Sequence, residues 1–172
     1  MIETRTVKNR RPLRFNSVQE LLAEVDLLAA SDRAGQLRRS GNWTLGQALG
    51  HLGAWVDFAF DGYPVKPPWV VRALIRPMKA RFLNRPLPEG VRLPGVKGGT
   101  VATEPLSTDE GLRRFRSAWE RLVANAPSRP NPVFGPLAHD EWIKAHLRHA
   151  ELHLGFFRAP ADGEGEPRSM VS

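Results

Sequence analysis

The segment from Thr44 to Gly62 constrains the fold most, because it has the signals of a helix that is apolar on nearly all sides. Thr44 and Gln47 have the spacing of a capping box, which marks a helix start, and Asp61-Gly62 is typical of a helix end. The apolar residues between these signals are Leu45, Ala48, Leu49, Leu52, Ala54, Trp55, Val56, Phe58, Ala59 and Phe60. A helix of this kind is normally buried. The sequence therefore predicts that other helices pack around residues 44–60.

Three further segments have apolar residues at helical spacing, namely residues 18–31, 107–125 and 139–157. The first two also begin with capping boxes, and no segment shows a convincing strand alternation. One long connection, residues 62–106, joins the second and third helices. Four helices with one long connection are typical of an all-α four-helix bundle with a crossover. In such a bundle the second and third helices can run parallel.

The connection is expected to carry an extra helix. Residues 67–84 can form a basic helix, which Pro77 should kink or split. Residues 85–106 are rich in glycine and proline and read as an irregular loop. We expect residues 1–158 to form a single domain and residues 159–172, which are small, polar and rich in glycine and proline, to form a disordered tail.

The composition excludes several classes of protein. The chain has no cysteine, which excludes disulfides, thiolate metal sites and a cysteine nucleophile. No stretch approaches the roughly 20 apolar residues that a membrane span needs, and the N-terminus has no apolar run typical of a signal peptide. These features predict a cytoplasmic protein with no membrane partner.

The net charge of +7 is unevenly distributed. Eight lysines and arginines lie between Lys66 and Lys97, against Glu89 alone. Such charge favours anionic partners through long-range attraction. A solvated basic surface is the simplest interpretation, and a small anionic substrate is another. Nucleic-acid binding ranks below both, because the sequence contains no RNP-like motif, zinc finger or clear helix-turn-helix.

The chain has five histidines, at His51, His139, His146, His149 and His153. His149 and His153 are four residues apart, so on a helix they share one face with Cβ atoms roughly 6 Å apart and can reach one cation. His51 can supply a third nitrogen if its helix is a neighbour. His146 shares the face of His149 and His153, which leaves a second ligand set open. The metalloprotease motif HExxH is absent.

Three neutral imidazoles suit a divalent metal ion such as zinc, nickel, iron, manganese or copper. They also leave coordination positions open for water or substrate, which is typical of a reactive site. Spacing does not determine which metal is bound.

Two motifs together resemble the DinB/YfiT-like superfamily: residues 42–52 (NWTLGQALGHL) and residues 149–154 (HAELHL). The similarity is closest to a bacterial branch that is described only as a domain of unknown function. Further matches to that branch are Asp61-Gly62, Arg76-Pro77, residues 132–137 and Glu141-Trp142. The resemblance covers most of residues 12–158.

The resemblance implies a four-helix bundle with a long second-to-third crossover, often dimeric. It also implies a metal held by one histidine of the second helix and an HxxxH pair of the fourth, which are His51, His149 and His153 here. Characterised members of the superfamily include metal-dependent transferases that use thiol cofactors such as bacillithiol or mycothiol, and a maleylpyruvate isomerase. Many others have no known activity, and one fold can host many functions.

Two main hypotheses follow for function. The first is a metal-dependent transferase or hydrolase acting on a small thiol or anionic substrate, which suits a chain without cysteine. Gln47 and Trp55, one turn before and after His51, and His146 are candidate substrate-binding residues, although core packing or helix capping would explain them equally well. The second is a non-catalytic bundle that the metal only stabilises. A basic nucleic-acid-associated protein is the third and least favoured.

Overall fold

The computed structural model describes residues 7, 10–65, 67–91, 96 and 99–160, and most of these are helical. The elements in chain order are α1 (Val18–Arg33), β1 (Arg38–Arg39), α2 (Leu45–Asp61), α3 (Trp69–Ile75), the 3₁₀-helix η2 (Arg76–Met78), α4 (Lys79–Asn84), α5 (Thr108–Ala124), α6 (His139–Leu154) and β2 (Phe157–Arg158). The all-α prediction is confirmed. None of the described helices is long and apolar enough to cross a membrane. The predicted tail lies, from residue 161 onward, outside the described residues.

Side-chain caps explain where the helices begin. Thr44 accepts a hydrogen bond from the backbone of Gln47, whose side chain in turn accepts one from the Thr44 backbone. Ser107 and Glu110 form the same reciprocal pair at the start of α5. These predicted helix starts are confirmed, because a capping box satisfies backbone donors that the first turn leaves free.

The last helix ends earlier than predicted, at Leu154 rather than at residue 157. Gly155 follows it, and Phe157–Arg158 pairs antiparallel with Arg38–Arg39. The expectation that the chain contains no strand was therefore wrong for this small sheet. Strands of two residues are too short to show the alternation by which a sequence indicates a strand.

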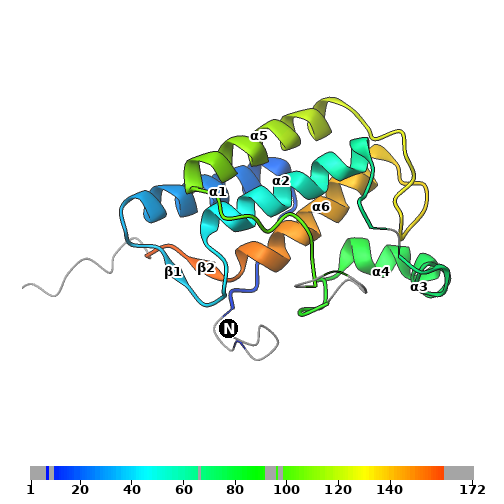
Figure 1. The fold of residues 1–172 in the computed structure, drawn as a ribbon, viewed down its shortest axis with the longest axis horizontal. Coiled ribbons are helices and arrows are strands. Elements are labelled where there is room, and N and C mark those ends of the chain that lie inside the picture. The colour runs from blue at the N-terminus through cyan, green and yellow to red at the C-terminus, as the bar shows by residue number, and fades with distance from the viewer. Residues whose placement is uncertain (1–6, 8–9, 66, 92–95, 97–98, 161–172) are drawn as a thin grey trace, which may run out of the picture.

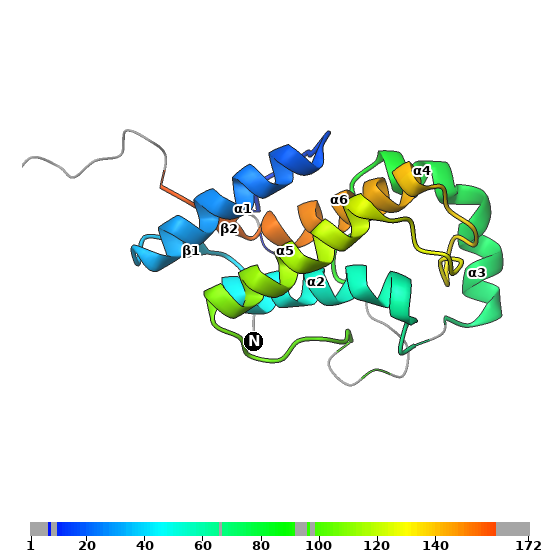
Figure 2. The same cartoon turned by 90° about the horizontal axis from the view of Figure 1, so that it is seen from above.

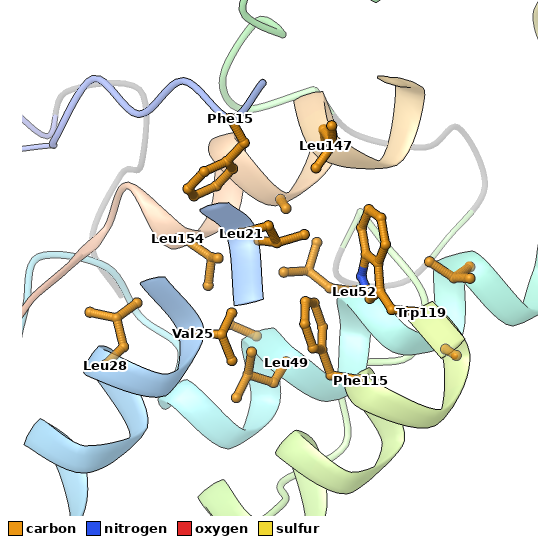
Figure 3. Packing of buried hydrophobic residues seen from close by; sticks show 14 of the residues in the cluster. Phe15, Leu21, Val25, Leu28, Leu49, Leu52, Phe115, Trp119, Leu147 and Leu154 are labelled. Atoms are coloured by element: carbon orange, nitrogen blue, oxygen red, sulfur yellow. The ribbon is translucent and has the colours of Figure 1, made fainter. Parts of the chain in front are cut away.

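The core lies between α1, α2, α5 and α6, and α2 contacts each of the other three (Figure 3). This position confirms that α2 is buried, as its apolar composition predicted. The residues that Figure 3 labels come from all four helices and from the segment before α1: Phe15, Leu21, Val25, Leu28, Leu49, Leu52, Phe115, Trp119, Leu147 and Leu154.

Helices α2 and α5 run parallel and approach closely. Gly46 at the start of α2 faces Gly111 at the start of α5, and Asp61 at the end of α2 pairs with Arg121 near the end of α5. A Cβ atom on Gly46 would lie 2.3 Å from the carbonyl oxygen of Leu106, so only glycine fits there. This close contact fixes α2 along its length, and with it the residue at its middle.

The connection between α2 and α5 carries a broken helix, as predicted. Pro77 lies within η2, between α3 and α4. Helix α4 packs against α6, where Lys79 forms an ion pair with Glu141. Figures 1 and 2 show α3 at the end of the molecule opposite the β1–β2 pair.

Candidate metal centre

Three histidines from two helices meet at one point. His51 lies in the middle of α2, and His149 and His153 lie one turn apart on α6. The Nε2 atom of His149 is 3.3 Å from Nε2 of His51 and 3.1 Å from Nε2 of His153. One nitrogen from each ring lies within 4.8 Å of the others. Of the two ligand sets that the sequence left open, the structure brings together the one that contains His51.

Burial keeps these imidazoles neutral. Desolvation lowers the pKa of His51 to about 4, although two backbone hydrogen bonds and Glu104 oppose it. Burial, followed by the neighbouring His153 and His51, places the pKa of His149 well below its ordinary value. Burial also lowers the pKa of His153, with His51 adding to the effect. Neutral imidazole is the form that binds metals.

A backbone carbonyl sets the tautomer of His51. The Nδ1 atom of His51 lies 2.9 Å from the carbonyl oxygen of Val101. That oxygen can only accept, so Nδ1 carries the proton and donates it. The Nε2 lone pair of His51 is therefore free and lies toward His149.

The contacts among the three rings leave a shortage of protons. His149 Nε2 faces the unprotonated His51 Nε2 on one side and His153 Nε2 on the other. A proton on His149 serves one contact well but not both, and a proton on His153 leaves His51 and His149 with opposed lone pairs. A single cation would satisfy all three nitrogens.

The distances also suit a metal ion. Zinc–nitrogen bonds of about 2.0–2.1 Å at tetrahedral angles separate two ligand nitrogens by roughly 3.3 Å. The two measured Nε2–Nε2 separations, 3.3 and 3.1 Å, are close to that value. The chemistry of the donor set and its spacing both fit a divalent cation, so this group could hold a metal ion.

Two tryptophans enclose the histidine cluster. The Trp43 ring stacks on His153 with a centroid separation of 5.1 Å and an interplanar angle of 7°. The Trp55 ring lies 5.1 Å from that of His149, and Tyr63 packs 5.6 Å from Trp55. Apolar rings at these positions limit the access of water and restrict the orientations of the imidazoles.

Gln47 anchors the segment that holds His51. Its Nε2 donates to the carbonyl oxygen of Thr103 at 3.3 Å, while its Oε1 closes the capping box of α2. Between Thr103 and Val101 lies Ala102, whose φ of 57° is in the left-handed region that residues with a Cβ rarely adopt. The Gln47 contact therefore helps to keep this strained turn, and the Val101 carbonyl, against His51.

The structure separates the three candidate substrate-binding residues. Trp55 touches the rings of His51 and His149, and Gln47 acts through the backbone beside His51. His146 instead lies in the core, stacked on Trp142 with centroids 5.9 Å apart and without a hydrogen-bond partner for Nε2 among the described residues. It belongs to a different environment from the cluster.

Sequence reasoning assigned no role to Trp43, Tyr63, Val101 or Arg10. The Arg10 guanidinium donates to the Glu151 carbonyl at 3.2 Å and contributes to the low pKa of His153. Trp43 had a usable signal, because an apolar residue just before an N-cap commonly packs on its own helix. The other three lie far from the histidine motifs in the sequence, and a backbone carbonyl such as that of Val101 leaves no signature in residue type.

The metal-free protein should lose stability as the pH falls below about 6.5. Burial lowers the folded-state pKa of His146 to about 4, while the unfolded chain keeps the ordinary value of 6.5. The unfolded state therefore binds protons first, and stability is complete above pH 6.5 and declines toward pH 4. At about pH 5 the cost for this histidine is about 2 kcal/mol.

Urea unfolding of the metal-free protein at about pH 7.5 and about pH 5 measures this loss. The His146→Leu variant should lose about 2 kcal/mol less between the two conditions than the parent protein. An unchanged pH dependence in that variant would show that His146 is not buried as a neutral side chain.

Comparison with known proteins adds one match. A family model described as "Protein of unknown function (DUF1569)" matches residues 7–160. This match confirms the expected similarity to a domain of unknown function. No curated protein and no solved structure matches the chain.

Proposed function

The chain belongs to the DUF1569 family of proteins of unknown function, and we propose that it is a metal-dependent enzyme. In this proposal His51, His149 and His153 bind one divalent cation. We further propose that residues 1–158 form one DinB-like four-helix bundle in which α3, η2 and α4 belong to the crossover. The parallel run of α2 and α5 supports this arrangement.

The observation that supports the proposal is the convergence of three neutral nitrogens whose lone pairs no proton arrangement satisfies. Within the described residues this group has three members and includes no carboxylate or fourth side chain. Structural zinc sites usually have four protein ligands, whereas catalytic sites have three and keep a position open. The ligand count therefore supports a reactive site over a purely structural one.

The chemistry would divide between the metal and the chain. A bound divalent cation supplies Lewis acidity, which lowers the pKa of a coordinated water or thiol. The three histidines hold the site, and Trp43 and Trp55 limit the access of water to it. Because the chain has no cysteine, a reactive thiol would have to come from the substrate. We therefore favour a transferase or hydrolase whose substrate is a small thiol or a small anion.

Added divalent metal should raise the melting temperature of the metal-free protein. A ligand that binds only the folded state stabilises it by about 2.7 kcal/mol at a hundredfold excess over its Kd. Alanine at His51, His149 or His153 should remove most of the increment, measured by thermal unfolding with and without zinc. His139→Ala is the matched control and should keep it. Loss of the increment in His146→Ala but not in His51→Ala would contradict the ligand assignment.

Gln47→Leu should weaken metal binding about tenfold, because the Val101 carbonyl would no longer be held against His51. The variant also loses a capping box, so Glu110→Leu, which loses the equivalent box on α5, is the matched control. Zinc affinity measured by competition with a chelator should fall in the first variant only. Equal affinities would show that Gln47 serves only as a helix cap.

An open coordination position should be visible in the cobalt-substituted protein. Addition of a small thiol should produce a sulfur-to-cobalt charge-transfer band, because the three histidines leave room for a further ligand. The His51→Ala variant, loaded to the same occupancy, tests whether the band depends on the intact site. A visible spectrum that is unchanged by thiols and by small anions would favour a metal that only stabilises the fold.

A further inference from the structure

One side of α3 exposes a cluster of large apolar residues. Seven large apolar side chains are exposed among the described residues, and four of them lie between residues 69 and 78. These four are Trp69, Val70, Leu74 and Met78, and they are called here the α3 face. Trp69 is 72% exposed and Leu74 is 68% exposed, so neither has found a partner within the fold. Such clustering is unusual for residues that merely happen to be on a surface.

The arrangement of the α3 face is regular. Val70, Leu74 and Met78 are four residues apart, which places them in a row along the helical segment. Val71 and Ile75, which are half-buried, lie on the other side of the segment, toward the rest of the protein. Helix α3 itself contains no buried residue and lies at the end of the molecule (Figure 2). The α3 face is therefore presented outward by a helix that uses its opposite side for docking.

Unpaired cations border the α3 face. Arg72, Arg76, Arg81 and Arg85 are exposed, and none forms an ion pair with an acidic group in the part of the chain that the structure describes. The exception in this region is Lys79, which pairs with Glu141. The sequence contains no acidic residue between Lys66 and Arg85. The surface thus combines exposed apolar side chains with positive charge that is not neutralised locally.

These features decide between the occupants that could cover the α3 face. A symmetric contact with a second copy would bring the same arginines of both copies together, which is repulsive. Single-stranded nucleic acid stacks its bases on aromatic rings, but here only Trp69 is aromatic and the other three side chains are aliphatic. A membrane surface accepts aliphatic side chains below its headgroups, tryptophan at the interface and arginine at lipid phosphates.

We propose that the α3 face lies in the surface of a bilayer that contains anionic lipids. Val70, Leu74 and Met78 enter the boundary between headgroups and acyl chains, with Trp69 beside them, and the arginines contact headgroup phosphates. The sequence-based expectation of no membrane partner rested on the absence of a spanning segment. That criterion does not apply to a helix that lies in the plane of the membrane.

Vesicle sedimentation with the full chain tests the proposal. The protein should bind vesicles that contain phosphatidylglycerol and not vesicles of phosphatidylcholine alone, and the binding should weaken as salt screens the arginines. Trp69 is the most exposed of the five tryptophans, so its fluorescence should shift to the blue on binding. Trp69→Phe should remove most of the shift while the protein still sediments with the vesicles.

Two pairs of variants separate the contributions of the apolar residues and the charges. Leu74→Ser should lower the partition coefficient about tenfold, whereas Leu27→Ser, which removes an exposed leucine from α1, should leave it unchanged. The double change Arg72→Gln with Arg76→Gln should lower it about 25-fold, at about fivefold for each cation. The control is Arg38→Gln with Arg39→Gln, on the exposed strand at the other end of the molecule.

Several outcomes would overturn the proposal. These are absence of binding, equal binding to both kinds of vesicle, or equal losses in the test and control variants. A dimer in solution that Leu74→Ser dissociates would instead assign the α3 face to contact between copies. Single-stranded DNA binding that the same substitution abolishes would assign it to nucleic acid.

Discussion

The burial of α2 between three other helices is the constraint on which the rest of the structure depends. Its side chains are apolar almost all round, so it has no face that can be left to solvent. Glycines at its contact with α5 allow the two backbones to approach, and this leaves α6 on another side. His51 is carried into the interior by the same packing and meets the two histidines of α6 there.

The cluster departs from the rules that govern the surrounding core. Three imidazoles lie together in apolar surroundings, with only one firm hydrogen bond to the backbone, from His51 to Val101. Such an arrangement disfavours protonation of every member and lowers acid stability. Proteins tolerate such conflicts mainly at functional sites. The enclosing tryptophans and the anchored turn at Val101 make sense as parts that hold this unfavourable group in one geometry.

Local signals in the sequence predicted the elements well and their relations less well. The capping boxes marked the starts of α2 and α5 because those contacts involve residues three apart. The spacing of His149 and His153 predicted their shared face for the same reason. The choice of His51 over His146 as the third member came from the family resemblance, because it depends on which helices are neighbours. Periodicity also could not show that α3 docks by Val71 and Ile75 and leaves its other apolar side exposed.

The most direct test of the central claim is X-ray absorption spectroscopy of the metal-loaded protein. Its fine structure reports the number of imidazole ligands and of other ligands around the metal. The account predicts three imidazoles, with one or more oxygen ligands that exchange for added substrate analogues, and two imidazoles in the His51→Ala variant. Two imidazoles in the parent protein, or an unchanged first shell in His51→Ala, would contradict a site built from α2 and α6 together.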